Sequence, residues 1–250
     1  MKKQEILKHL EDDSKYYGRF GNQFLSNSKI QDLLKDDPYG FLQGGVETLP
    51  MVRGRYFHIA MLEPHKLGEF DVIDAATRNN KTYREASNGV LKLLQHEVDD
   101  LQFLIDKMKS SKEISDLIYS KNTKYEVPGL VELFGNTWKG KADIEATDYL
   151  FDIKTTSDIN SFENSAHKYN YDSQSYIYSK MFGKPLVFIV IDSNKKNKSY
   201  GSMGLFSCGD EFLERGESKV KKASAVYDKF FGPNANANQI RENFLIRKTL

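Results

Sequence analysis

Hydrophobic positions change their spacing about halfway along the chain. Through residues 84–119, apolar side chains recur every three or four positions, which predicts a long helical region. Serines precede an apolar stripe that ends before Pro38, so a short helix is expected within residues 26–41. Residues 43–54 have the composition of a loop, and a second helix is expected to follow until Pro64. The first half of the chain is therefore predicted to be helical.

From about residue 120 onward the period falls from about 3.6 residues to 2, the spacing of β-strands. Three successive strands are predicted at 124–136, 137–147 and 149–156, with turn signals at Gly135-Asn136 and Thr147-Asp148. The later elements are a helix at 159–182, a buried central strand at 185–193, a strand at 200–207 and an amphipathic helix at 209–231. We therefore expect an α/β (α+β) fold, in which helices flank a central mixed β-sheet.

Composition narrows the class of protein. Apolar residues make up 39% of the 250 residues and charged residues 28%, as in soluble globular proteins. No apolar run reaches the roughly 18–20 residues of a membrane helix, and the first residues are too polar for a secretory signal. We therefore expect a cytoplasmic protein. The single cysteine, Cys208, excludes an internal disulfide and a cysteine-rich metal site. The net charge of +1 gives no global polycation signal, although basic residues can still gather on one face.

Two aspartates and a lysine stand in one predicted hairpin. If Thr147-Asp148 is a two-residue turn, the antiparallel register places Asp143 opposite Asp152, with Cβ atoms ~5 Å apart. Lys154 projects from the same face as Asp152. The neighbouring apolar side chains are expected to share the opposite, core-facing side: Ala142, Ile144, Phe151 and Ile153.

Opposed carboxylates repel each other, so something must neutralise them. Lys154 offers one positive charge, and a divalent cation such as Mg²⁺ or Mn²⁺ offers two in an oxygen-rich site. Such an ion can lower the pKa of a bound water and stabilise a phosphorane-like transition state, while the lysine neutralises developing charge. The alternative is a solvated strand face with a weak surface ion pair. An exposed face, however, has no need of the second, opposed aspartate.

The hairpin also carries a family resemblance. Residues 140–156, GKADIEATDYLFDIKTT, resemble the D-(x)n-(D/E)-x-K motif of the PD-(D/E)XK nuclease superfamily. Gln174 and Tyr178 match the Q-x-x-x-Y arrangement that follows this motif in the RecB-like and RecE-like branches. GRYFHIAMLEP, residues 54–64, resembles the G-x-x-x-H-x-x-x-L-E-P segment of RecE-like exodeoxyribonuclease VIII domains, and residues 25–41 resemble the helical start of those domains.

The resemblance covers roughly residues 24–192 and implies a restriction-endonuclease-like core. It further implies a single nuclease domain over residues 1–250. Its expected parts are a helical N-terminal part at 1–120, a catalytic core at 121–231 and a C-terminal tail at 232–250.

Carried over to this sequence, the resemblance implies that Asp143 and Asp152 are metal ligands and that Lys154 is the catalytic lysine. His58 corresponds to a histidine that adds a metal ligand in this branch. Without the family, a lone histidine in an apolar helix would be interpreted as a core residue.

The branch also has a glutamate ahead of the first aspartate. Glu126 is the better match, and Glu132 on the same strand face is its rival. Gln174 and Tyr178 share one helix face and would hold the lysine or contact a DNA phosphate, although Tyr178 could instead pack against the sheet. Six further side chains near the motifs are candidate contacts to the DNA backbone or ordinary surface residues: Arg53, Arg55, Lys139, Lys141, Thr155 and Lys168.

By resemblance, the chain is a Mg²⁺-dependent deoxyribonuclease, with Mn²⁺ able to substitute. The leading hypothesis is an exonuclease that degrades DNA from duplex ends in recombination, repair or phage DNA metabolism. A ring-shaped homo-oligomer and a single-strand annealing or recombination partner fit this hypothesis, and no membrane association is expected. Two alternatives stay open: a structure-specific or restriction-type endonuclease, and a non-catalytic protein that binds DNA ends. The intact aspartates and lysine argue against the latter.

Overall fold

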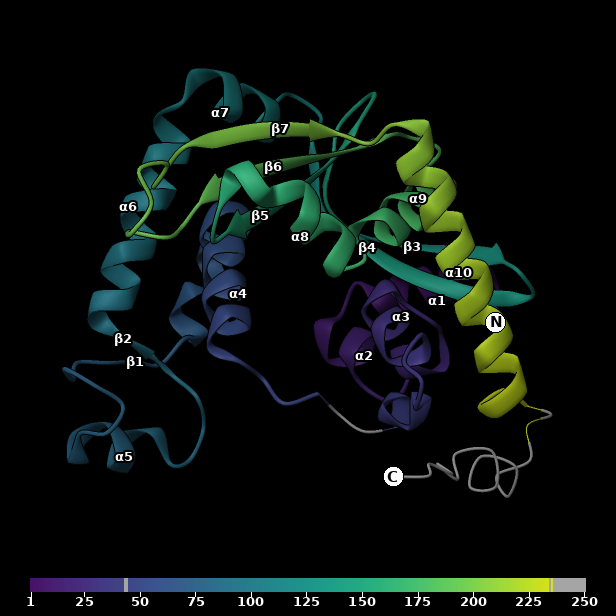
Figure 1. Cartoon of the computed structure of the whole chain (residues 1–250), viewed down its shortest axis with the longest axis horizontal. Helices are drawn as coiled ribbons and strands as arrows, with labels where there is room; N and C mark the ends of the chain where they lie inside the picture. The colour runs from purple at the N-terminus through teal and green to yellow at the C-terminus, as the bar shows by residue number, and fades with distance from the viewer. Residues whose placement is uncertain (43–44, 234, 236–250) are drawn as a thin grey trace, which may run out of the picture.

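A five-stranded mixed sheet forms the centre of the computed structural model, which describes residues 1–42, 45–233 and 235. In spatial order its strands are β3 (Lys124–Leu133), β4 (Asn136–Glu145), β5 (Leu150–Thr156), β6 (Leu186–Asp192) and β7 (Met203–Ser207). Within this sheet β5 and β6 run parallel, and all other neighbours are antiparallel (Figure 1). The sheet is therefore mixed, as the sequence predicts.

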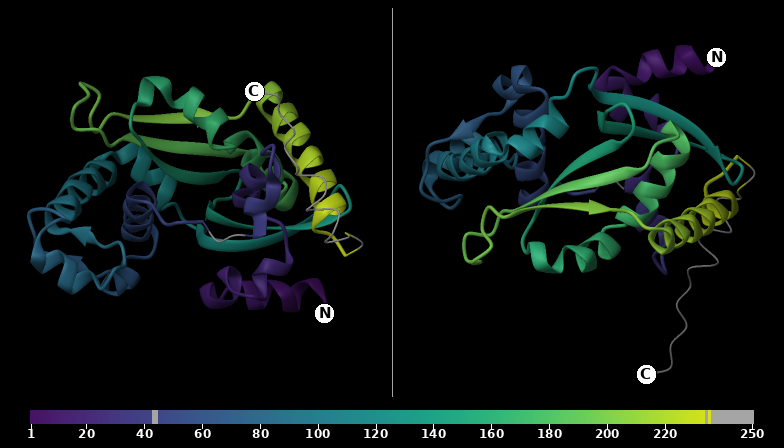
Figure 2. Two further views of the ribbon diagram at one scale, coloured as in Figure 1. Left: turned by 60° about the horizontal axis from the view of Figure 1, so that its bottom comes forward. Right: turned by 90° about the horizontal axis from the view of Figure 1, so that it is seen from above.

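Helices cover both faces of this sheet (Figures 1 and 2). The helices on one face are α4 (Leu49–Leu62), α6 (Gln95–Ser110) and α7 (Lys112–Ile118). Those on the other face are α3 (Asn27–Leu33), α8 (Phe162–Lys168), α9 (Tyr171–Phe182) and α10 (Asp210–Phe230). Along β6, Val187, Ile189 and Ile191 face the first group, whereas Phe188 and Val190 face the second. A strand covered on both sides must be apolar throughout, which explains the continuous apolar run in the sequence.

Two smaller parts extend from this core. The N-terminal part contains α1 (Lys3–Leu10), α2 (Asp13–Tyr17), a 3-10 turn η1 (Gly21–Gln23) and, after α3, η2 (Pro38–Leu42). The part between α4 and α6 contains η3 (Pro64–Glu69), β1 (Val72–Ile73), α5 (Lys81–Ser87) and β2 (Leu93–Leu94), with β1 and β2 paired in parallel. A last turn, η4 (Ile159–Ser161), precedes α8. Figure 1 shows α5 with β1 and β2 standing apart from α1–α3.

The predicted strands and the last helix are confirmed, whereas three helix boundaries are wrong. Residues 84–119 are not one helical region, because Asn88 (φ 49°) and Gly89 turn the chain after α5 and β2 precedes α6. Likewise, Asn170 (φ 58°) divides the predicted helix at 159–182 into α8 and α9. The loop expected at 43–54 ends early, since α4 begins at Leu49 and carries Pro50 in its first turn, where no N–H donor is needed.

Four apolar residues of the β4–β5 hairpin are predicted to face one side of the sheet, and three of them do. Ile144, Phe151 and Ile153 belong to one core cluster, but Ala142 packs with Trp138 in the other. The reason is that β4 pairs with β5 only at its last two residues and follows β3 before that, so the strand turns between positions 142 and 144.

No helix within residues 1–42, 45–233 and 235 is both long enough and apolar enough to cross a membrane. Most of the predicted tail at 232–250 lies outside the described residues.

Candidate metal centre

Three carboxylates lie at one level of three neighbouring strands. The β4–β5 register pairs Ile144 with Phe151, so Asp143 and Asp152 are the next positions beyond the last paired residues of a hairpin with the predicted two-residue turn. The β3–β4 register pairs residues on both sides of Glu126 and Asp143, so these two acids also oppose each other. Glu126 adopts φ 52°, an unfavourable backbone conformation for a non-glycine residue that costs of order 1–3 kcal/mol. Strain of this size at an acidic residue favours a functional role over an ordinary strand position.

Helix α4 contributes a histidine to this group. His58 Nε2 lies 2.9 Å from Asp143 Oδ2 and 3.5 Å from Glu126 Oε1. Asp143 Oδ2 also accepts a hydrogen bond from the Ile153 N–H at 3.1 Å. The imidazole of His58 thus reaches the acids of β3 and β4 from the face of the sheet that α4 covers.

Asp152 faces Lys154 and helix α9. Lys154 Nζ lies 2.6 Å from Asp152 Oδ2, and Gln174 Nε2 donates a hydrogen bond of 2.5 Å to Asp152 Oδ1. The side chain of Asp152 is only 2% exposed, and Lys154 Nζ also lies 4.9 Å from the centroid of the Tyr171 ring. Asp152 is therefore the most enclosed member of the group.

Burial and the short distances between these side chains shift their pKa values. Burial lowers the pKa of His58, but Asp143 and Glu126 outweigh it and raise that pKa to about 9. Burial, opposed by His58 and reinforced by Asp143, raises the pKa of Glu126 to about 7. Burial and the neighbouring Asp143 also raise the pKa of Asp152. Glu126 and Asp152 therefore retain protons at pH values at which ordinary carboxyl groups have lost them.

The two central groups shift in opposite directions. Burial would raise the pKa of Asp143, yet the His58 imidazolium, Lys154 and the Ile153 N–H lower it overall. Burial would lower the pKa of Lys154, but Asp152 outweighs it and raises that pKa above its usual range. The lysine is consequently protonated at neutral pH.

These residues fit a divalent cation. His58, Glu126 and Asp143 each offer a ligand atom, and the three atoms lie within 4.8 Å of one another. Glu126 Oε1 and Asp152 Oδ2 are buried oxygens whose neighbouring cationic groups are His58 at 3.5 Å and Lys154 at 2.6 Å, respectively. Carboxylate oxygens suit Mg²⁺ and Mn²⁺, and the imidazole adds a nitrogen ligand. A cation would coordinate these buried oxygens and relieve the repulsion between the acids.

The other predicted site residues lie at different distances from this group. Of the two rival glutamates, Glu126 lies beside His58 and Asp143. Glu132 lies at the other end of β3, where it accepts a hydrogen bond from Thr137 of β4. The Tyr178 hydroxyl is buried and bonds both backbone groups of Lys141, so it fastens α9 to β4. Thr155 follows Lys154 in β5 and is partly buried.

Several residues predicted to contact DNA are instead buried or paired with other protein groups. Lys139 and Lys141 are 5% and 8% exposed, so in this conformation neither is presented to DNA. Arg55 pairs with Glu47, and Arg53 is partly buried on another side of α4, near Glu97 and Lys195. Lys168 is exposed at the end of α8.

The N-terminal helices hold the two buried lysines, which the sequence analysis did not foresee. Asp13 pairs with Lys141 and, at 2.9 Å, with Lys66. Lys139 donates a hydrogen bond to the backbone carbonyl of Tyr16, and burial, followed by the charge of Lys141, lowers the pKa of Lys139 to about 8. The sequence offers no local signal for these contacts, because the partners lie more than a hundred residues apart.

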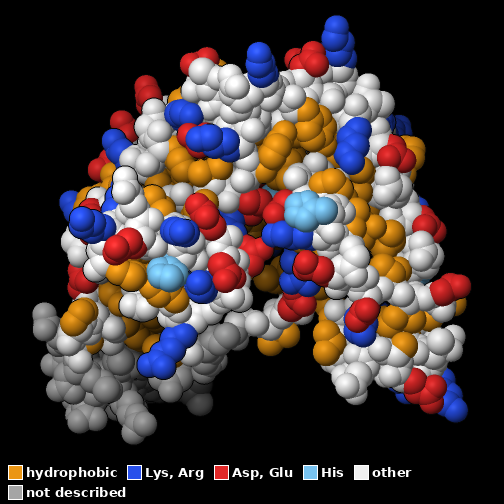
Figure 3. All heavy atoms as spheres, turned by 180° about the vertical axis from the view of Figure 1, so that it is seen from behind, with side chains coloured by type: hydrophobic (Ala, Val, Ile, Leu, Met, Phe, Trp, Pro, Cys, Tyr) orange, Lys and Arg blue, Asp and Glu red, His pale blue; other side chains and the backbone are white. Residues whose placement is uncertain are grey.

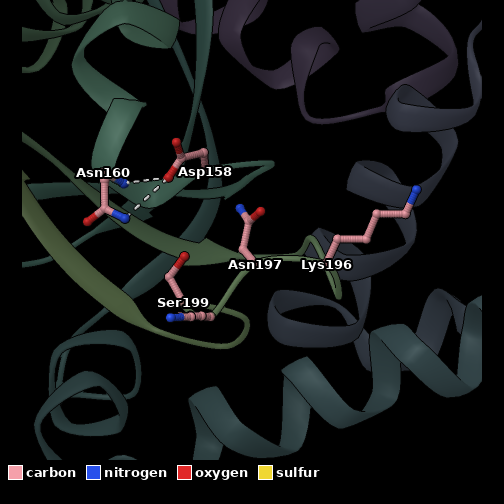
Figure 4. Close-up of a pocket in the computed structure, with 6 residues that line it drawn as sticks. Asp158, Asn160, Lys196, Asn197 and Ser199 are labelled. Atoms are coloured by element: carbon pink, nitrogen blue, oxygen red, sulfur yellow. Dashed lines mark hydrogen bonds between the residues drawn. The ribbon is translucent and has the colours of Figure 1, made fainter.

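A deep notch divides the molecule when it is seen from behind. Figure 3 shows acidic and basic side chains gathered at its inner end, between the part that contains α1–α3 and the part that contains α4 and α5. A separate open cavity of about 560 Å³ lies at the ends of β5 and β6 (Figure 4). Its lining consists of Asp158, Asn160, Lys196, Asn197, Lys198 and Ser199. None of these belongs to the acidic group, by which we mean Glu126, Asp143 and Asp152.

Comparisons with known proteins follow this geometry. A family model described as "PDDEXK-like domain of unknown function (DUF3799)" matches residues 40–235. The crystal structure of a candidate exonuclease from Eubacterium rectale is similar, with 14% identity, a TM-score of 0.66, and coverage of 96% of this chain and 95% of that chain. At this identity the likeness concerns the fold, and it agrees with the predicted sheet flanked by helices.

Two other solved structures align less closely. An alkaline exonuclease from Laribacter hongkongensis has 12% identity and a TM-score of 0.36, over 88% of this chain and 91% of that chain. A phage related exonuclease from Haemophilus somnus 129PT has 16% identity and a TM-score of 0.34, over 82% of this chain and 93% of that chain. No curated protein shows significant sequence similarity to this chain.

Proposed function

Because this chain belongs to the family of PDDEXK-like domains, as the hairpin motif predicted, we propose that it is a divalent-metal-dependent nuclease that hydrolyses phosphodiester bonds in DNA. One observation carries the proposal: three acids from adjacent strands converge with a histidine and a protonated lysine. A surface of ordinary solvated charges would not bury three carboxylates side by side, as the low exposure of Asp152, Asp143 and Glu126 shows here.

The side chains divide the work as follows. Glu126, Asp143 and His58 would hold the ion, together with Asp152. A Mg²⁺ ion held there, or Mn²⁺ in its place, supplies a Lewis acid and lowers the pKa of a coordinated water.

Lys154 acts on the phosphate. Because Asp152 keeps its ammonium group protonated, Lys154 stabilises negative charge that develops on the phosphate rather than accepting a proton. Gln174 holds the Asp152 carboxylate in position, and the Ile153 N–H does the same for Asp143. The positions of both acids are thus set by groups that take no part in the chemistry.

We further propose that the enzyme is an exonuclease acting at DNA ends. The resemblance of residues 54–64 to RecE-like exodeoxyribonuclease VIII domains and the notch beside the core both support attack at an end. Recombination, repair or phage DNA metabolism is the process that such an activity serves.

The test compares linear duplex DNA with covalently closed circular DNA in the presence of Mg²⁺ or Mn²⁺. We expect the linear DNA alone to be degraded, and the chelator EDTA to stop the reaction. Asp152→Asn and Lys154→Ala should each lower the rate by roughly 10²–10³-fold or more, because the first removes a carboxylate that would hold the ion and the second removes positive charge at the reacting phosphate.

Glu132→Gln, at the far end of β3, is the matched control and should retain the wild-type rate. Nicking of the closed circle would identify an endonuclease. Undiminished hydrolysis by both folded variants, Asp152→Asn and Lys154→Ala, would refute the assignment of the site, and specific binding of DNA ends with no hydrolysis at all would identify an accessory protein.

A further inference from the structure

Tyr17 presents an exposed aromatic ring beside the acidic group. The residue is 68% exposed at the end of α2, yet its ring centroid lies 5.7 Å from Lys141 Nζ, which is itself 3.9 Å from Glu126 Oε2. Desolvation by nearby protein atoms, followed by the carboxylates of Glu126, Asp13 and Asp143, raises the pKa of Tyr17 to about 12. The phenol therefore stays neutral and close to the acids, while much of the ring is open to solvent.

The ring of Tyr17 is held in place by the residues beneath it. Tyr16, only 7% exposed, meets it edge to face with centroids 4.9 Å apart. The Tyr16 ring lies in turn 4.2 Å from Lys139 Nζ and 4.7 Å from Lys141 Nζ. Tyr16 also packs against Leu130 of β3. The edge contact with Tyr16 therefore supports one side of the Tyr17 ring and lowers the conformational entropy that Tyr17 would lose on binding a ligand.

A fixed and exposed ring near a phosphate-hydrolysing site matches a nucleobase. Stacking of one base on an aromatic side chain contributes about 1–3 kcal/mol, whatever the base. A base inside a duplex is already stacked on both of its faces, so such a ring can accept a base only at an end of the DNA, where a terminal pair has one free face and an unpaired base has two. On this side of the site Lys139 and Lys141 are buried, whereas the Tyr17 ring is exposed and open to a ligand.

We infer that Tyr17 stacks on an unpaired nucleobase at the end of the strand that is cut. The inference rests on the proposed nuclease function and specifies its immediate substrate as a separated strand end rather than a paired duplex end.

The experiment measures equilibrium binding of a short fluorescein-labelled single-stranded DNA by anisotropy in Ca²⁺, an ion that takes the same oxygen ligands. Strands carry either normal bases or one abasic residue placed at successive positions from the end. We expect Tyr17→Ala to weaken binding of the normal strand about 10-fold, within the range for one stacked base, and Tyr17→Phe to stay within about twofold of wild type. One abasic position should weaken wild-type binding by a similar factor and cause no further loss in Tyr17→Ala.

Three results would overturn the inference. They are wild-type binding by Tyr17→Ala, equal losses in Tyr17→Phe and Tyr17→Ala, and losses that add at every abasic position. Tyr149→Ala removes a tyrosine that is 47% exposed in the β4–β5 turn and should bind normally. Because binding in Ca²⁺ does not depend on hydrolysis, the stacking is tested even when Mg²⁺-dependent cleavage is absent, which would count against the proposed function alone.

Discussion

At the scale of single residues, Glu126, Asp143 and Asp152 coexist because positive charge lies among them. His58 and Lys154 supply that charge within the protein, while burial and the neighbouring Asp143 still raise the pKa of Glu126 to about 7. A bound divalent cation would take over the role of the retained protons, so metal binding and proton release should be linked.

This linkage predicts how stability depends on pH in EDTA. Glu126 rises from a pKa of 4.5 to about 7 on folding, and His58 rises from 6.5 to about 9. A raised pKa stabilises the fold below the unfolded value and loses that contribution as the pH passes the folded value. We therefore expect the melting temperature in EDTA to fall between pH 4.5 and about pH 9, and added Mn²⁺ to stabilise the protein more at pH 8 than at pH 6.

The control for this prediction is His58→Gln, which should flatten the part of the decline above pH 6.5. A melting temperature in EDTA that rises across this range, or an effect of Mn²⁺ that does not change with pH, would contradict the linkage. Both quantities are read from thermal unfolding followed by circular dichroism.

At the scale of elements, helix α9 positions the site from the side away from α4. A Cβ atom at Gly140 would lie 2.6 Å from the Tyr178 ring, so only glycine lets the helix pack this closely on β4. The Tyr178 hydroxyl donates to the Lys141 carbonyl at 3.0 Å and accepts from the Lys141 N–H at 3.2 Å. The same helix carries Gln174 to Asp152. Thus α9 is fastened to β4 two residues before Asp143.

Tyr178→Phe should therefore act mainly on stability. It removes a buried hydroxyl that satisfies two backbone groups, which costs about 1–3 kcal/mol of unfolding free energy. Its effect on the rate of DNA hydrolysis should be much smaller than that of Lys154→Ala. Urea denaturation measures the first quantity, and Tyr149→Phe in the exposed turn should show no loss. If Tyr178→Phe kept full stability but lost hydrolysis, Tyr178 would instead be a catalytic residue.

At the scale of the whole molecule, the N-terminal helices close one side of the site. Asp13 on α2 pairs with Lys66 of η3 and with Lys141 of β4, and Lys141 Nζ also lies 3.9 Å from Glu126 Oε2. The N-terminal part thus neutralises positive charge beside the acids.

Asp13→Asn should release this charge. Lys66 keeps Glu63 at 2.6 Å, so Lys141 is the lysine that gains most freedom to contact a phosphate. We expect tighter DNA binding at low salt in Ca²⁺, and a steeper plot of log affinity against log salt, by about 0.7–0.9 for one added phosphate contact. Asp12→Asn, whose carboxylate caps α2 at Ser14, is the neighbouring control. An unchanged slope would mean that Lys141 stays buried without its partner.

The sequence by itself determined the strands and the core of the motif. The turn at Thr147-Asp148 and the alternation of β4 and β5 are local features, so the register that brings Asp143 and Asp152 near each other follows from neighbouring residues alone. The spacing of Asp152 and Lys154 on one strand face is equally local. The breaks at Asn88 and Asn170 were missed because a left-handed residue leaves the hydrophobic period on either side intact.

Which distant residues come together at the acids depends on how the elements pack. Glu126 is selected over Glu132 by the register of β3 on β4 and by a backbone conformation that no sequence pattern announces. Packing of the N-terminal helices on β4 buries Lys139 and Lys141, which from the sequence are candidate DNA contacts. A residue pattern encodes contacts within an element, whereas burial and charge depend on which elements meet in space, and that is settled by packing of the whole chain.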